Sequence, residues 1–217
     1  MSSLSAAGTA HTAETTAASP PALEAASLSG RLREGAPALF PTDTLPALAA
    51  RPEAAAQLWE LKGRPSHKPV ILMGAELREL LDQLGVPVLP AWRALAEAHW
   101  PGGLTLVLPA RGALLEQLNP GGTSLGLRVP ACPMALELLR LTGPLATTSA
   151  NRSGEPPCLT ASEAQERFPE VPLLAPTPWP AGSGQASTVV TWTDASHWQL
   201  LRQGVVTLPG AMTTPGS

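Results

Sequence analysis

The chain of 217 residues contains no tyrosine, two phenylalanines and only two lysines, Lys62 and Lys68. Charged residues make up 14% of it, and the formal net charge at pH 7 is −3. Proteins that bind nucleic acid through many phosphate contacts usually carry a clear excess of basic residues. The composition therefore predicts no overall attraction to nucleic acid, and any site for an anion must be local.

Cysteine and histidine are also scarce. The two cysteines, Cys132 and Cys158, form no CxxC pair, and the four histidines show neither HxxxH nor HExxH spacing. These absences argue against a disulfide scaffold and against a zinc centre. No apolar run is long enough to span a bilayer, and the N-terminus lacks the basic and apolar regions of a secretory signal. We therefore expect a cytoplasmic protein without a membrane partner.

The residues that are present alternate between helix and strand patterns. Amphipathic spacing, prolines at helix starts and capping signals predict helices, whereas short apolar or alternating runs predict strands. The expected helices cover residues 23–34, 51–61, 75–84, 90–99, 133–141 and 160–168. The expected strands cover residues 36–40, 70–73, 104–108, 124–130, 144–148, 187–192 and 200–204.

This order of elements predicts the fold class. Helices that alternate with several successive strands indicate one α/β (α+β) domain on a twisted, mixed β-sheet flanked by helices. With 44% apolar residues, the chain is long enough for a sizeable core. We expect the domain to cover residues 21–208, between a disordered tail at 1–20 and a loose C-terminal tail at 209–217.

Both lysines fall in the stretch from Leu61 to Pro69, and Arg64 lies between them. Two prolines and a glycine keep this stretch from being helix interior, and the apolar run after it indicates a buried strand. Three cations on a stiff loop repel one another unless a phosphate or carboxylate supplies a counter-charge. The stretch predicts either an anion-binding loop or a solvated surface turn.

Three further stretches place small polar side chains or glycines next to expected strands. They are Thr42 to Thr44, the adjacent glycines at 102 and 103, and the segment 147–153 with five hydroxyl or amide side chains in seven positions. Ligands of open α/β sheets bind near strand ends. Each stretch can instead be structural, as an N-cap with an Asx-type turn, a turn that needs positive φ, or a capped turn.

Six motifs stand in a characteristic order along the chain. They are Phe40-Pro41-Thr42-Asp43-Thr44, Leu61-Lys62-Gly63-Arg64-Pro65 with Lys68-Pro69, Trp100-Pro101-Gly102, Leu127-Arg128-Val129-Pro130, Thr148-Ser149-Ala150-Asn151-Arg152-Ser153-Gly154 and Ser187-Thr188-Val189-Val190. Together they resemble the YrdC/TsaC family, over about residues 24 to 206. The resemblance implies a YrdC-like sheet with a concave, basic face, in the short single-domain type of the family.

The resemblance also implies an activity. Members of this family are L-threonylcarbamoyladenylate synthases, nucleotidyltransferases that join L-threonine, bicarbonate and ATP into threonylcarbamoyl-AMP and release pyrophosphate. Threonylcarbamoyl transferase proteins then modify an adenosine of tRNA, so these proteins are the implied partners, together with a contact to tRNA. Magnesium bound through the ATP phosphates (Mg2+ with ATP) is the expected metal, without a metal site on the protein.

Matching the motifs residue by residue implies two ligand groups. L-threonine would be held by Thr42, Lys68, Arg128, Thr147 and Ser187, and ATP by Lys62, Arg64, Ser124, Ser149, Asn151 and Arg202, with Lys68 between the two groups. Lys62 and Arg64 would act in catalysis by stabilising the leaving pyrophosphate. The substrates supply amine and carboxylate, so positioning can replace an enzyme nucleophile.

The chain departs from the family pattern in two places. The family usually continues PTDT with a hydrophobic residue and Tyr-Gly-Leu, where this chain has Leu45-Pro46-Ala47-Leu48, and the usual PGP is Pro101-Gly102-Gly103. The first change alters one wall of the expected threonine pocket. A non-catalytic paralogue that binds nucleotides or double-stranded RNA therefore stays open. Further alternatives are a bare structural domain and a carbamoyl-adenylate enzyme of hydrogenase maturation, which normally lies in a longer chain with zinc fingers.

Overall fold

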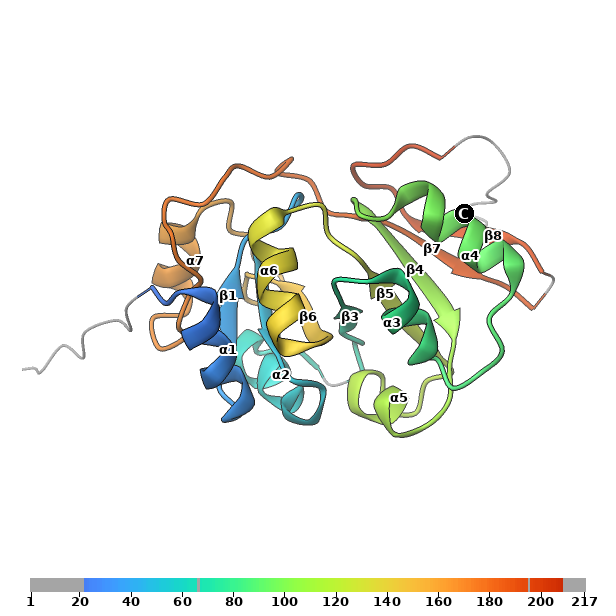
Figure 1. Cartoon of the computed structure of the whole chain (residues 1–217), viewed down its shortest axis with the longest axis horizontal. Helices are drawn as coiled ribbons and strands as arrows, with labels where there is room; N and C mark the ends of the chain where they lie inside the picture. Colours follow the sequence, from blue (N-terminus) through green and yellow to red (C-terminus); the bar gives the residue numbers. More distant parts are fainter. Residues whose placement is uncertain (1–21, 66, 195, 209–217) are drawn as a thin grey trace, which may run out of the picture.

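The computed structural model describes residues 22–65, 67–194 and 196–208, so the two tails expected from the sequence lie outside the described residues. The elements follow one another as shown in Figure 1. The helices are α1 (Ala25–Arg33), α2 (Ala56–Lys62), α3 (Leu77–Asp82), α4 (Pro90–His99), α5 (Ala113–Leu118), α6 (Pro133–Thr142) and α7 (Ala161–Arg167), with a 3-10 turn at Pro52–Ala54. The strands are β1 (Ala38–Phe40), β2 (Ala47–Ala50), β3 (Ile71–Met73), β4 (Leu104–Pro109), β5 (Ser124–Arg128), β6 (Leu145–Ser149), β7 (Thr188–Trp192) and β8 (Trp198–Arg202).

All eight strands form one sheet in the order β1-β2-β6-β3-β5-β4-β7-β8. The pairs β3/β5 and β4/β7 are parallel, and the other neighbours are antiparallel. The sheet is therefore mixed, and the predicted α/β class is confirmed.

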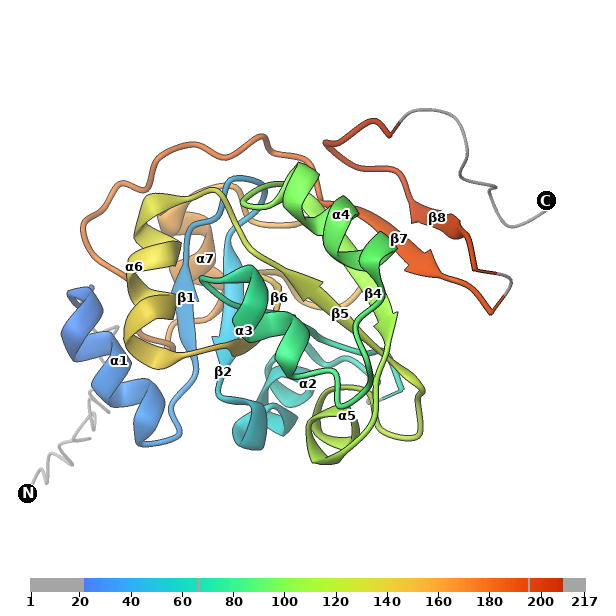
Figure 2. The same cartoon turned by 45° about the vertical axis from the view of Figure 1, so that its right-hand side comes forward.

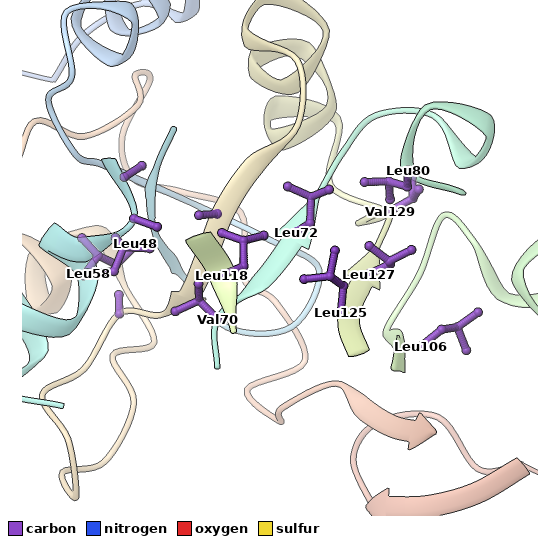
Figure 3. Packing of buried hydrophobic residues seen from close by; sticks show 14 of the residues in the cluster. Leu48, Leu58, Val70, Leu72, Leu80, Leu106, Leu118, Leu125, Leu127 and Val129 are labelled. Carbon is purple, nitrogen blue, oxygen red and sulfur yellow. The ribbon is translucent and has the colours of Figure 1, made fainter. Parts of the chain in front are cut away.

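Alternation along the strands divides the core into two clusters, because successive side chains face opposite sides of a sheet. On one side, Leu72, Leu106 and Leu127 pack with residues of α2, α3, α4, α5 and α7. Figure 3 shows part of this cluster, with Leu80 of α3 beside Leu127 and Val129. On the other side, residues of β1, β2, β3 and β6 pack beneath α1 and α6. Helices α1 and α6 pack against each other near β1 (Figure 2).

Three elements differ from the sequence prediction. Strand β2 and helix α5 were not expected, and the helix expected over 51–61 is a 3-10 turn followed by α2. Neither Gly102 nor Gly103 has positive φ, so that interpretation of the turn is wrong. The Gly102 N–H donates to the Val129 carbonyl (2.8 Å), and a Cβ on Gly102 would lie 2.4 Å from the His99 carbonyl oxygen. Close approach of backbone is what requires glycine at position 102.

Cys132 and Cys158 are both free and buried. Within the described ranges, no helix is long and apolar enough to cross a membrane. The same part of the chain contains no group of three or more His, Cys, Asp or Glu that could hold a metal ion.

Candidate functional site

A cavity of about 470 Å³ opens on the sheet face that carries the α1/α6 cluster, beyond the part that these helices cover. Its floor is formed by alternate residues of the central strands, and its walls by loops from distant parts of the sequence. The lining residues are Thr42, Thr44, Leu45, Pro46, Ala47, Arg64, Pro69, Val70, Ile71, Met73, Thr105, Val107, Asn119, Ser124, Gly126, Arg128, Thr147, Thr148, Ser149, Ala186, Ser187, Val189, Leu201 and Arg202.

Strand register arranges the floor in three rows. The middle row runs from Thr147 through Ile71 and Gly126 to Val107. Gly126 has no side chain, so the cavity floor is open at this position. A Cβ there would also lie too close to Ile71, at 2.7 Å from its Cγ2. Consecutive rows are two residues apart along the strands, or about 7 Å, so the outer rows are separated by about 13 Å.

The outer rows are polar, and we call them the Arg128 end and the Ser149 end. At the Arg128 end, Arg128 pairs with Met73, and Thr105 pairs with Val189, which is also opposite Arg202. At the Ser149 end, Ser149 pairs with Ala47, and Ser124 pairs with Pro109. The cavity thus offers two polar ends joined by a mainly apolar floor, a form that suits a ligand, or two ligands, with two different polar groups.

Arg128 dominates its end of the cavity. Its side chain is 4% exposed, and three of its nitrogens donate hydrogen bonds: Nε to the Gly102 carbonyl (2.9 Å), Nη1 to Thr44 Oγ1 (2.7 Å) and Nη2 to Asp43 Oδ1 (2.8 Å). Burial lowers the pKa of Arg128, Asp43 opposes this shift and Arg202 adds to it. A guanidinium nevertheless stays charged in proteins, so this end carries a fixed positive charge.

The Thr42 hydroxyl contacts Thr44, the hydroxyl that accepts a hydrogen bond from Arg128. Thr42 Oγ1 donates to the Leu45 carbonyl (2.8 Å) and accepts from the Thr44 N–H (3.1 Å). Because Thr42 has given its only hydrogen to Leu45, Thr44 must be the donor in the 3.0 Å contact between the two hydroxyls. Both lone pairs of the Thr42 oxygen are then used within the protein. The threonine contact expected of this hydroxyl stays a prediction.

Ser187 and Arg202 form the opposite wall of the Arg128 end. Ser187 Oγ lies 2.8 Å from Thr105 Oγ1 and accepts from Nη2 of Arg202 (3.1 Å). Arg202 also donates through Nε and Nη2 to the Ser187 carbonyl (3.1 and 2.8 Å). Arg202, which the resemblance assigns to ATP, therefore lies beside Ser187, which it assigns to threonine.

Arg64 enters near the Ser149 end from the loop after α2. Helix α2 ends at Gly63 in the left-handed conformation (φ +57°), which turns the chain so that Arg64 points back over the sheet. Arg64 donates through Nη2 to the Pro69 carbonyl (2.9 Å), and Nη1 lies 3.5 Å from Thr148 Oγ1. Its Nε is buried without a hydrogen-bond partner, and burial lowers its pKa. A buried donor without an acceptor favours an acceptor on a ligand.

Lys62 does not line the cavity. It is 3% exposed, and its ammonium donates to the Ser149 carbonyl (2.5 Å), the Asn151 carbonyl (2.5 Å) and Asn151 Oδ1 (2.9 Å). All three N–H groups thus fix the turn after β6. Burial, and secondly the charge of Arg64, lower the pKa of Lys62 to about 8. Asn151 Oδ1 also accepts from Ser149 Oγ (2.6 Å), so Lys62 orients Ser149, which does line the cavity.

Eight of the eleven residues expected from the sequence line the cavity, namely Thr42, Arg64, Ser124, Arg128, Thr147, Ser149, Ser187 and Arg202. The other three are Lys62 and Asn151, which hold the turn after β6, and the exposed Lys68. The sequence did not identify Thr105, Ile71 or Gly126 as floor residues, because only strand register shows which side of the sheet they face. Leu45, Pro46 and Ala47 form a wall, so the departure from the family pattern does lie in the cavity.

The electrostatics of the cavity define the class of site. Three arginines line it, and no Asp or Glu is among the described lining residues. Asp43 is not a lining residue, but its carboxylate forms an ion pair with Arg128 and so supplies a counter-charge. The chain is thus a single mixed α/β domain with a positively charged cavity on one face of its sheet, and the concave, basic face expected from the sequence is present.

The family follows from comparison with known proteins. The model of the Sua5/YciO/YrdC family, described as "Telomere recombination", matches residues 31–204, and the chain belongs to this family. Threonylcarbamoyl-AMP synthase of Bacillus subtilis is 35% identical over 181 residues, which cover 81% of this chain and 52% of that protein. The synthase of Vibrio parahaemolyticus is 30% identical over 178 residues, which cover 80% of this chain and 95% of that protein.

Solved structures agree with the fold. Sua5 of Pyrococcus abyssi complexed with L-threonine matches with a TM-score of 0.77 and 30% identity, over 85% of this chain and 57% of that one. Escherichia coli YciO matches with a TM-score of 0.73 over 85% of this chain and 91% of that one, and at 23% identity it shows the fold alone. The chain therefore spans little more than half the length of the Pyrococcus and Bacillus proteins.

Proposed function

We propose that this protein is an L-threonylcarbamoyladenylate synthase, a cytoplasmic nucleotidyltransferase in the synthesis of N6-threonylcarbamoyladenosine in tRNA. The observation that carries the proposal is a cavity with two cationic ends about 13 Å apart, Arg128 with Arg202 and Arg64 with Ser149, on a mainly apolar floor. That distance suits an amino acid at one end and the triphosphate of a nucleotide at the other. The names of the relatives and the threonine complex of Pyrococcus Sua5 support it.

The Arg128 end is the proposed site of L-threonine. A buried guanidinium suits the carboxylate of an amino acid, and the neighbouring Ser187 and Thr105 hydroxyls can bond to its polar atoms. Bicarbonate condenses with the threonine amine to a carbamate, with loss of water. A carbamate oxygen then attacks the α-phosphorus of ATP, and the bond to pyrophosphate breaks.

The Ser149 end is the proposed site of the phosphates. Arg64 carries a fixed charge and a spare Nε donor, and it would stabilise the charge that develops on the leaving pyrophosphate. Lys62 would act through the turn that it holds. Because hydroxyls and guanidinium groups line the cavity and no described lining residue is a carboxylate, the residues fit phosphate oxygens better than a bare cation. Mg2+ would therefore arrive on the ATP phosphates.

Release of pyrophosphate by the purified protein tests the proposal. With ATP, Mg2+ and bicarbonate, we expect release that depends on L-threonine, and none with L-serine in its place. Threonylcarbamoyl-AMP should appear in the same mixture by mass spectrometry. Binding of ATP without release would contradict the proposal and favour a non-catalytic nucleotide- or RNA-binding protein. The proposed partners, threonylcarbamoyl transferase proteins and tRNA, can be tested with the same product as donor.

A further inference from the structure

Arg128 depends on one carboxylate for its position. A buried charge without a partner is strongly unfavourable, and repulsion from the neighbouring Arg202 further disfavours the charged form of Arg128. Among the described residues that bond to Arg128, Asp43 is the one that carries a negative charge, and it accepts from Nη2 at 2.8 Å. The Gly102 carbonyl and the Thr44 hydroxyl supply neutral acceptors.

Asp43 itself stands outside the cavity. It is not a lining residue, and its side chain is 21% exposed. Its Oδ1 accepts a second hydrogen bond, from the Ala131 N–H (2.8 Å), and its backbone carbonyl accepts from the Ser183 N–H (3.0 Å). Asp43 thereby ties together the segment after β1, the segment after β5 and the loop before β7. Its carboxylate is held by the segment after β5 and its backbone by the loop before β7, so the carboxylate is a rigid support for a cation.

The hydrogen-bond count leaves Arg128 able to bind a ligand. A guanidinium has five N–H groups, and Arg128 uses three of them within the protein, one on each nitrogen. One N–H on Nη1 and one on Nη2 remain, on a side chain that lines the cavity. We propose that Asp43 is a positioning residue that holds these two N–H groups of Arg128 ready for the carboxylate of the amino-acid substrate; this inference rests on the proposed function.

The inference predicts a loss that is specific to one substrate. Without the Asp43 carboxylate, the Arg128 guanidinium loses its counter-charge and one of its three anchors, so it is free to turn toward solvent. Binding of L-threonine should weaken, whereas the Ser149 end, about 13 Å away, should keep its affinity for ATP. A purely structural role would lower stability and leave the ratio of the two affinities unchanged.

Calorimetry on the full chain, with L-threonine and ATP titrated separately, measures both affinities. We expect Asp43→Asn, which keeps an oxygen acceptor but loses the charge, to raise the Kd for L-threonine at least fivefold and to change the Kd for ATP less than twofold. Asp43→Ala should raise the threonine Kd further. The matched control is Asp82→Asn, which removes an exposed aspartate that contacts Arg78 on α3 and should change neither Kd.

A double-mutant cycle isolates the route through Arg128. In an Arg128→Gln background, Asp43→Asn should cause no further loss of threonine binding, because the group that it positions is gone. Equal losses in both backgrounds, or an unchanged threonine Kd in folded Asp43→Asn, would overturn the inference and leave the proposed function standing. Failure of the unmodified protein to bind L-threonine would overturn both. Thermal melts identify any variant that does not fold, and Asp43→Asn then decides in place of Asp43→Ala.

Discussion

Arg64 lines the cavity with a buried side-chain donor that the protein leaves without a partner. Its Nε has no partner, and its contact with Thr148 is 3.5 Å long. We expect Arg64→Ala to lower the rate of pyrophosphate release at least about tenfold, because hydrogen bonds to a charged group contribute about 1.5–3 kcal/mol each. The melting temperature should change little. Steady-state kinetics checks this against Arg78→Ala, which alters an exposed arginine of α3, and unchanged turnover in Arg64→Ala would contradict the role.

Lys62 makes a second prediction, on pH dependence. Its pKa falls from an ordinary value of 10.5 to about 8 in the folded protein, chiefly through burial. Between these pH values the unfolded chain binds more protons than the folded one, so this group makes the free energy of unfolding rise with pH. Lys62→Met lacks this contribution.

Urea unfolding at several pH values measures the effect of Lys62. The unmodified protein should gain stability over Lys62→Met as pH rises from about 8 to about 10.5, the window set by the lowered pKa. A stability difference that stays constant across this window would show that Lys62 titrates normally.

The residue types in the sequence explain why some residues of the cavity could be predicted and others could not. Arg64, Arg128 and Ser187 stand in motifs whose residue types already suggest ligand binding. The local bonds of Thr42 agree with the structural alternative for its stretch, whereas those of Lys62 could not be foreseen, since they are made to backbone carbonyls across the fold. Sequence shows that a lysine is present, and not whether its ammonium faces a ligand or a turn.

At the scale of elements, the N-cap of α7 is Thr160, where Thr160-Ala161-Ser162-Glu163 predicts a capping box, and the structure shows the Thr160 half of it, while the Glu163 carboxylate binds the N–H one residue before the N-cap. Thr160 Oγ1 accepts from the Glu163 N–H (3.2 Å), and Glu163 Oε2 accepts from the Leu159 N–H (2.7 Å). We expect Thr160→Ala to lower the free energy of unfolding by about 1 kcal/mol, because an N–H of the first turn loses its acceptor. Urea unfolding compares it with Ser162→Ala, an exposed change in the same turn, and equal stability of the two variants would contradict the cap.

The two unexpected elements share a physical reason for having been missed. Strand β2, Ala47–Ala50, is buried at all four positions, so it has no alternating pattern, and alanine is a weak strand former. Helix α5, Ala113–Leu118, has six residues, too few for a clear helical period. Both are defined by their neighbours: β2 lies between β1 and β6, and Leu115 and Leu118 of α5 belong to the larger core cluster.

At the scale of the whole molecule, the cavity exists because segments far apart in the sequence close over one sheet. Ser187 meets Thr105 across 82 positions, and Arg128 meets Asp43 across 85. The order of the motifs gave no indication of these pairings. Only the crossover order of the strands, with β5 and β4 between β3 and β7, brings the two ends of the chain to one cavity.

A substitution at Gly182 tests whether the cavity depends on close packing between the loop before β7 and the segment Thr42–Thr44. A Cβ there would lie 2.3 Å from the Thr44 carbonyl oxygen and 2.9 Å from that of Thr42, both backbone atoms that cannot move alone. We expect Gly182→Ala to push the loop before β7 away from Thr42–Thr44, lowering the free energy of unfolding by about 1–3 kcal/mol and weakening L-threonine binding. The control, Gly30→Ala in α1, meets nothing within 4 Å and should stabilise by about 0.5–1 kcal/mol. Urea unfolding and threonine calorimetry measure both variants. If Gly182→Ala is as stable as the unmodified protein and binds L-threonine normally, the cavity does not depend on this close contact of the loop.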